Sequence, residues 1–175
     1  ANLTPPSLKA IIPWEGAADM YRDFAFHGGL FCFGFVANWY MNHMAHHTLG
    51  KLYEGNPDTF SKNWVWHYMR DNLDRGQYRG RQAEWDKLEL PIYTVGNWSG
   101  MGLHLRGNTE AFVQAKSKHK KLRIHAGTHY HPFYAEEARH DQIRFLDHWL
   151  KGKKNGVMDE PPVKLLIRTG GGKGY

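Results

Sequence analysis

Residues 90–95 read Leu-Pro-Ile-Tyr-Thr-Val and lead directly into a glycine-rich segment, residues 96–102. A short apolar run with β-branched residues that ends in glycines is typical of a buried strand followed by a loop. The pattern then predicts a helix over 103–115, a second buried strand over 122–125, and the clearest helix over 135–150. Because strands and helices alternate, the sequence predicts an α/β fold with a parallel sheet.

A further buried strand is predicted near the start of the chain, over residues 8–14, where Glu15-Gly16 then turns the backbone. Strands of a parallel sheet are buried on both faces, so this early strand needs neighbours that the 175 residues do not supply. We therefore expect the second half of a larger α/β domain. Between the first two strands, a helix is predicted over 57–73. Pro161-Pro162 marks a boundary before another strand pattern over 163–168.

Composition is typical of a globular protein, with 41% hydrophobic and 14% aromatic residues. The single cysteine, Cys32, allows no internal disulfide and weakly favours a cytoplasmic protein. No stretch is long and apolar enough to span a membrane. The net charge of +6 makes nucleic-acid binding a function to consider. The basic residues are scattered, however, except for a run around His119, which we interpret as a solvated loop. That run contains Lys116, Lys118, Lys120 and Lys121. We expect no nucleic-acid or membrane partner.

Several blocks in fixed order give the chain a resemblance to a known family. They are residues 5–16 with 19–22, residues 96–98 with 102–107 (Gly-Leu-His-Leu-Arg-Gly), residues 145–152 (Phe-Leu-Asp-His-Trp-Leu-Lys-Gly) and residues 161–163. Together they resemble the CocE/NonD hydrolases, which include cocaine-esterase-like and X-Pro dipeptidyl-peptidase-like enzymes. The resemblance implies the second half of an α/β-hydrolase domain with an inserted helical cap, running into a β jelly-roll domain. The core would be residues 1–16 and 90–152, the cap 17–89, and the start of the β domain 161–175.

The resemblance also implies a serine hydrolase that cleaves ester, amide or X-Pro peptide bonds. Its nucleophile would lie on a G-x-S-x-G turn, and no such motif occurs in these residues. Ser99 lacks both flanking glycines and is interpreted as a loop serine. We therefore expect the serine upstream of Ala1 and the chain alone to be inactive. The expected partners are a small ester, amide or peptide substrate and the N-terminal half of the hydrolase domain. Assembly into a homo-oligomer is a further hypothesis.

The strongest candidate site residue is His129, in the segment His-Ala-Gly-Thr-His-Tyr-His-Pro at 125–132. The histidine of an α/β-hydrolase follows the last strand of the sheet, before the final helix, and the resemblance places it at His129. An imidazole there would take the serine proton and return it to the leaving group. His131 is the alternative. The competing interpretation of His129 is a loop histidine with a structural hydrogen bond.

The carboxylate that should orient this histidine is less obvious. The resemblance implies an aspartate in the loop at 96–102, but that loop contains no acidic residue. Strand ends of a parallel sheet meet at one edge, so a carboxylate at the end of a neighbouring strand can take its place. Glu15 is the first choice, and we expect its carboxylate within hydrogen-bond reach of His129. Asp19 or an upstream residue are the alternatives.

Two other kinds of protein remain as hypotheses. His125, His129 and His131 could ligate zinc, as could a second cluster of His43, His46 and His47. No acidic residue falls inside the first cluster and no cysteine lies near either, so neither a metal nor a cofactor is expected. The loop at 96–102 also lacks an acidic residue. A non-catalytic binding or structural derivative of the hydrolase fold is therefore a further hypothesis.

Overall fold

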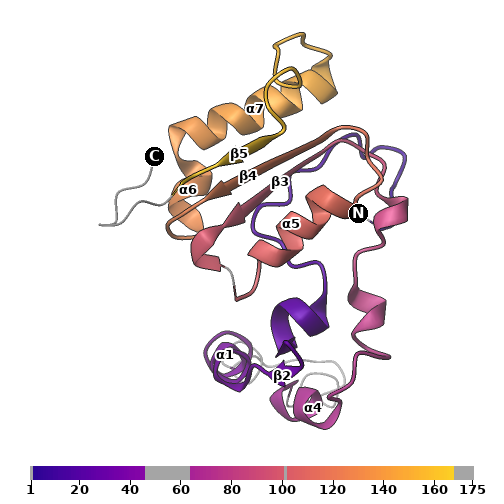
Figure 1. Ribbon diagram of the computed structural model, residues 1–175, viewed down its shortest axis with the longest axis vertical. Coiled ribbons are helices and arrows are strands. Elements are labelled where there is room, and N and C mark those ends of the chain that lie inside the picture. The colour runs from indigo at the N-terminus through magenta and orange to yellow at the C-terminus, as the bar shows by residue number, and fades with distance from the viewer. Residues whose placement is uncertain (1, 46–63, 101, 168–175) are drawn as a thin grey trace, which may run out of the picture. The chain divides into compact units, whose positions relative to one another are not determined.

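The chain forms two units, one of Ala1–Ala18 with Gln82–Tyr175 and the other of Asp19–Arg81. Figure 1 presents the computed structural model, which describes residues 2–45, 64–100 and 102–167. The first unit contains the strands β3 (Ile92–Asn97), β4 (Lys120–His125) and β5 (Val163–Leu165) and the helices α5 (Leu105–Gln114), α6 (Tyr130–Tyr134) and α7 (Glu136–Lys151). It also has short 3-10 turns at Trp85–Lys87 and Trp98–Gly100.

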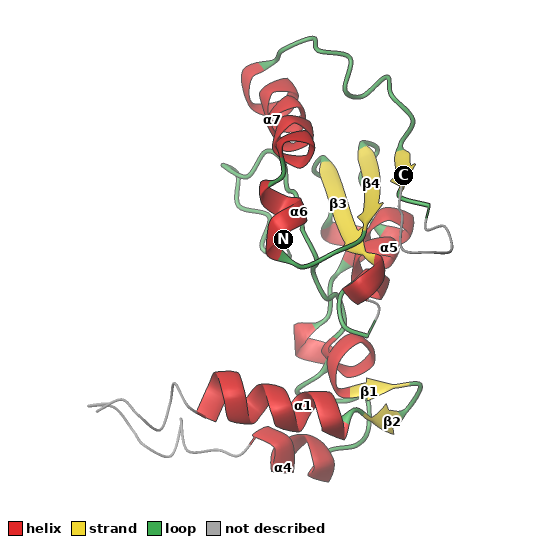
Figure 2. Ribbon diagram, turned by 90° about the vertical axis from the view of Figure 1, so that its left-hand side faces the viewer, coloured by secondary structure: helices red, strands yellow, loops and turns green. Residues whose placement is uncertain are grey.

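The strands form a parallel sheet in the order β3-β4-β5. In Figure 2, β3 and β4 lie side by side and point the same way. Helix α5 connects β3 to β4, while α6 and α7 connect β4 to β5. The alternation of strands and helices therefore gives the parallel pairing that the sequence predicts. Helix α7 ends at Lys151 and is capped by Gly152, whose φ of +65° places it in the left-handed region that terminates a helix.

Residues 11–14 lie along the other edge of β3, where parallel bridges join Ile11 to Ile92 and Trp14 to Val95. The strand predicted over 8–14 is thus present as extended backbone with isolated bridges rather than as a continuous strand. Pro13 explains the interruption, because proline has no N–H to donate to a ladder. Its carbonyl still accepts a hydrogen bond from the Val95 N–H at 3.0 Å.

Alternate residues of β3 face opposite helices. Ile92 packs with Ala111 and Ala115, which lie on and just after α5, whereas Tyr93 and Val95 pack with Phe145 of α7. Figure 1 shows these two helices on opposite faces of the sheet. This period of two explains why residues 92–95 read as a continuous apolar run: both faces of the strand are covered.

Three features of the first unit differ from the sequence analysis. The segment at 126–132 is not entirely loop, because α6 begins at Tyr130. Lys121, which we interpreted as part of a solvated basic loop, lies in β4 and is 7% exposed. Strand β5 pairs in parallel with β4 and so extends this sheet. Membership of β5 in a following β domain stays a prediction.

The second unit has its own aromatic core. It contains π-helical turns at Met20–Ala25 and Tyr40–Ala45, strands β1 (Phe26–His27) and β2 (Leu30–Phe31), helices α1 (Phe33–Trp39) and α4 (Trp64–Arg70), and a 3-10 turn at Arg79–Arg81. Strands β1 and β2 form an antiparallel hairpin, and α1 lies beside α4 (Figure 2). Phe26, Val36, Tyr68 and Tyr78 are buried together.

Among the described residues, no helix combines the length and the apolar character needed to cross a membrane.

Helix α5 approaches the turn after Glu15 so closely that only glycine fits at the contact. A Cβ built on Gly107 would lie 2.5 Å from the Gly16 carbonyl oxygen and 2.6 Å from the Ala18 nitrogen. These neighbours are backbone atoms, which cannot rotate away as a flexible side chain would. Asn108 reinforces the contact, because the Gly16 N–H donates to its Oδ1 at 3.1 Å.

We expect Gly107→Ala to lower the free energy of unfolding by roughly 2–3 kcal/mol, because the overpacking exceeds the gain of about 1 kcal/mol in helix propensity. Urea denaturation of the purified protein would measure this loss.

The matched control is Gly34→Ala in α1, where a new Cβ meets nothing within 4 Å. This variant should be as stable as the wild type or slightly more so. Equal stability of the Gly107→Ala variant would contradict the close approach.

Candidate active site

The carboxyl ends of neighbouring parallel segments bring polar side chains to one edge of the sheet. Asn97 ends β3 and pairs in register with His125, which ends β4. On the other side of β3, Glu15 follows the extended segment, and its N–H donates to the Val95 carbonyl at 2.8 Å. Such an edge is where open α/β sheets bind ligands.

Glu15 has an unusual backbone conformation. Its φ is +52°, in the left-handed region that residues other than glycine rarely adopt. Such a conformation costs on the order of 1–3 kcal/mol and is found preferentially at functional sites. The side chain is only 4% exposed, so it lies almost wholly inside the protein. The fold therefore holds a carboxylate in a fixed, buried position at the strand ends.

The expected contact between Glu15 and His129 is present. Nδ1 of His129 is hydrogen-bonded to Oε2 of Glu15. His129 lies just before α6 and its side chain is 55% exposed. A buried carboxylate on Nδ1 fixes the tautomer of the ring, so that Nε2 is the nitrogen left to exchange protons. This pairing of acid and imidazole is the chemical core of the site.

Asn97 holds the carboxylate and the histidine loop together. Its Nδ2 donates to Glu15 Oε1 at 3.1 Å and to the Gly127 carbonyl at 2.9 Å. Its Oδ1 accepts from the Ser99 N–H at 2.9 Å, so each polar atom of this 1%-exposed side chain has a partner. Sequence reasoning missed Asn97 because it looked for a negative charge in that loop, whereas an amide serves there as a donor to the charge.

Two more histidines adjoin the same carboxylate. His125 Nε2 lies 3.3 Å from Glu15 Oε1 without forming a hydrogen bond to it, and His104 Nδ1 lies 3.7 Å from Oε2. The ring of His104 also meets the ring of His129 edge-on, with centroids 5.2 Å apart. His125 was known from the sequence only as a metal candidate, and His104 only as part of a family block. No local sequence pattern indicates that His104 or His125 lies beside Glu15.

Burial lowers the pKa of the His125 ring below its ordinary value, and the Ala126 carbonyl and the Glu15 carboxylate offset only part of this effect. The ring also packs against Trp14, with centroids 5.3 Å apart. At neutral pH His125 is therefore uncharged and does not compete with His129 for the charge of Glu15.

The alternative site residues are placed differently. His131 is exposed on α6, and its backbone N–H donates to Thr128 Oγ1 at 3.2 Å. Asp19 caps the turn that it precedes: its Oδ1 accepts from the N–H groups of Tyr21 and Arg22, and its Oδ2 pairs with the Arg22 guanidinium at 2.7 Å.

The first histidine cluster proposed for zinc is not assembled as such, and the second lies partly outside the described residues. In the part of the chain that the structure describes, the group of potential ligands that converges is Glu15, His104 and His129, rather than His125, His129 and His131. In the second cluster His43 lies in the turn at Tyr40–Ala45, while His46 and His47 fall outside the described residues.

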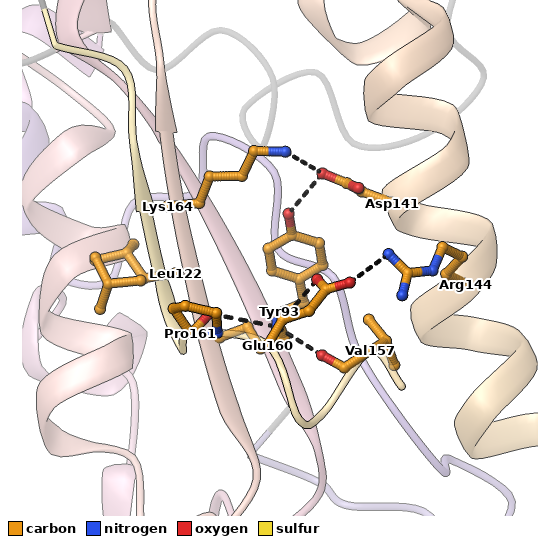
Figure 3. A pocket seen from close by; sticks show the side chains of 10 residues that line it. Tyr93, Leu122, Asp141, Arg144, Val157, Glu160, Pro161 and Lys164 are labelled. Atoms are coloured by element: carbon orange, nitrogen blue, oxygen red, sulfur yellow. Dashed lines mark hydrogen bonds and ion pairs between the residues drawn. The ribbon is translucent and has the colours of Figure 1, made fainter. Parts of the chain in front are cut away.

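A cavity of about 370 Å³ lies elsewhere, between β4, α7 and the segment that leads into β5. Figure 3 shows hydrogen bonds and ion pairs among the residues that line it. Lys121 Nζ donates to the Val157 carbonyl at 2.7 Å, Arg144 pairs with Glu160 at 2.6 Å, and Lys164 lies 3.2 Å from Asp141. These pairs attach the segment before β5 to the sheet and to α7, so we interpret the cavity as structural.

Comparisons with known proteins agree on one family. The family described as X-Pro dipeptidyl-peptidase (S15 family) matches residues 1–131. Two crystal structures of a CocE/NonD family hydrolase from Staphylococcus aureus are similar to this chain, with 34% and 35% sequence identity and a TM-score of 0.85 each. Each match covers 99% of this chain and 30% of the hydrolase chain, so the present residues span under a third of that protein.

No curated protein matches the chain. The family match covers most of the sequence, and the resemblance to CocE/NonD hydrolases is confirmed. The chain belongs to the S15 family of X-Pro dipeptidyl-peptidases and, with its structural neighbours, to the CocE/NonD-like hydrolases.

Proposed function

We propose that this chain supplies the base and the acid of a serine hydrolase of the α/β-hydrolase type. His129 is the base and Glu15 is the acid. The observation that carries the proposal is the hydrogen bond from His129 Nδ1 to a carboxylate that is buried at the strand ends. The nucleophilic serine would come from a G-x-S-x-G turn outside these 175 residues, because the sequence contains no such motif.

In this mechanism Nε2 of His129 takes the proton from the serine Oγ as the oxygen attacks the substrate carbonyl. Nε2 then returns the proton to the departing alcohol or amine. The Glu15 carboxylate accepts the hydrogen bond from the Nδ1–H group throughout and stabilises the imidazolium that forms between the two steps. In the second half of the reaction, water gives a proton to Nε2 as it attacks the acyl group, and Nε2 returns a proton to the serine Oγ as that oxygen leaves. The substrate would be an ester, an amide or an X-Pro peptide.

Asn97 and His125 would act through Glu15 rather than on the substrate. Asn97 restrains the carboxylate by donating to Oε1, which leaves Oε2 for His129. A protonated His125 would draw the same carboxylate toward itself, since its Nε2 lies 3.3 Å from Oε1. Keeping His125 neutral by burial therefore reserves the acid for the catalytic ring.

We also propose that residues 17–89, within which Asp19–Arg81 form a unit of their own, are the helical cap inserted between residues 1–16 and 90–152 of the hydrolase core. Its buried aromatic cluster gives it a core of its own, as an inserted element requires. Residues from 161 onward would lead into a following β domain.

We expect Glu15→Gln in the intact protein to lower kcat on a chromogenic ester on the order of 10⁴-fold, as loss of the triad acid does in serine proteases. Glutamine keeps the size and one hydrogen bond but cannot stabilise the imidazolium. Steady-state kinetics would measure the effect.

Asp19→Asn is the matched control, because it also removes one carboxylate near the same turn while asparagine preserves the helix cap. This variant should keep the wild-type kcat. Normal turnover by the Glu15→Gln variant, or a comparable loss in the Asp19→Asn variant, would refute the assignment of the acid.

Acid should destabilise the protein in part through His125. The pKa of this ring is lowered in the folded state, so below its ordinary value of about 6.5 the unfolded chain takes up a proton that the folded chain resists. Stability therefore falls as pH falls. Replacing His125 with glutamine should reduce the loss of unfolding free energy between pH 7.5 and pH 5.5 by about 1 kcal/mol.

Denaturant unfolding at the two pH values would measure this difference. The control is His140→Gln, the same substitution at an exposed position of α7. The same acid-induced loss in the His125→Gln variant as in the wild type would show that His125 is protonated as readily in the folded protein as in the unfolded chain.

A further inference from the structure

Three side chains from separate segments bring metal-ligating atoms to one point. Glu15 follows the extended edge segment, His104 precedes α5, and His129 precedes α6, yet one ligand atom from each lies within 4.8 Å of the others. Both rings approach the same atom, Glu15 Oε2: His129 Nδ1 is hydrogen-bonded to it and His104 Nδ1 lies 3.7 Å away. An acid–imidazole pair alone does not account for the second ring.

The donor set suits zinc. Two imidazoles and one carboxylate are the protein ligands of several catalytic zinc sites, which leave a fourth position for water. With zinc–ligand bonds of about 2.0–2.2 Å, two ligand atoms at a tetrahedral angle lie about 3.4 Å apart. The separation of 3.7 Å between His104 Nδ1 and Glu15 Oε2 is close to this value. The hydrogen bond from His129 would open to admit the ion.

The surroundings favour a defined site over adventitious surface binding. The Glu15 and His104 side chains are 4% and 21% exposed, so two of the ligands are held inside the protein. Asn97 donates to the second oxygen of the carboxylate, as outer-shell partners do in metal sites. His129 is 55% exposed and lies on the solvent side, where an ion can enter and a water can complete the coordination.

A metal on Nδ1 changes what His129 can do. An imidazole that ligates through Nδ1 carries its proton on Nε2, so Nε2 can no longer accept the proton of a nucleophile. The ion would also take the carboxylate that stabilises the imidazolium.

We propose that Glu15, His104 and His129 bind one zinc-class divalent ion, and that the bound ion reversibly blocks the hydrolase. The binding site stands on the geometry alone, whereas the blocking rests on the proposed function. His104 is the residue that separates the two roles: the acid–base pair is Glu15 with His129, and the ion needs His104 as well.

Titration of the intact, metal-free protein with Co²⁺ tests the site without relying on activity. The wild type should show the ligand-field absorption of a low-coordinate site that saturates at one ion per chain, and zinc should displace the cobalt. His104→Ala should weaken zinc binding by more than the roughly 10–100-fold that loss of an outer-shell partner costs. His104→Asn is the conservative second variant. It would be used if circular dichroism shows that the alanine variant is unfolded.

The matched control is His131→Ala, which removes an exposed imidazole two residues from His129. This variant should bind zinc as the wild type does. If His104→Ala binds as tightly as the wild type, or if His131→Ala loses the ion instead, the assigned ligand set is wrong.

Hydrolysis of a chromogenic ester tests the blocking, with each variant compared with its own metal-free rate. Zinc should abolish the wild-type rate over the concentration range in which it displaces cobalt, and a chelator should restore it. Full activity at saturating zinc would overturn the blocking. A protein that binds one ion through His104 but hydrolyses no ester without metal would refute the proposed function and leave the metal site established.

Discussion

The pairing of residues 11–15 with β3 is the constraint on which the site depends. Backbone hydrogen bonds link Ile11 to the Pro91 carbonyl and Glu15 to the Val95 carbonyl at 3.0 and 2.8 Å, with two more between them. Asn108 fastens the same segment to the helix behind it, since its Nδ2 donates to the Pro13 carbonyl at 3.0 Å. These contacts determine where Glu15 leaves the sheet. Without them a carboxylate 114 positions from His129 in the chain would not meet the ring.

Within the site, several polar side chains lie around one negatively charged group, the Glu15 carboxylate. Three imidazoles, those of His104, His125 and His129, and the amide of Asn97 surround the Glu15 carboxylate. Burial settles part of the competition, because it lowers the pKa of His125 and keeps that ring neutral. Asn97 occupies one carboxylate oxygen, and the other is directed at the exposed ring of His129. A single buried charge thus has one strong imidazole partner, which is the arrangement that an acid–base pair requires.

Regular elements of the first unit were predictable because each carries a local signal. The strand at β3 reads as an apolar run, since both of its faces are covered, and α7 carries a basic last turn and a glycine stop at Gly152. The loop at 126–132 was less readable: α6 begins at Tyr130 and includes Pro132 in its first turn, which a local pattern treats as a break. The prediction that Lys121 lies in a solvated loop was also wrong. Charge predicts exposure, but its ammonium finds a buried carbonyl partner in Val157.

The sequence by itself determined the alternation of strands and helices and the family resemblance, which pointed to His129 as the proposed base. The shared edge of parallel strands made Glu15 the first choice for its acid, with Asp19 as an alternative. Only the tertiary structure decided what surrounds that pair. Asn97 became a bridge between Glu15 and the histidine loop, and His104 became a second ring on the same carboxylate, while His131 was left at the surface. These outcomes depend on the register of β3 with β4 and on where α5 begins. Side chains that meet across separate segments leave no periodic signal in any one of them.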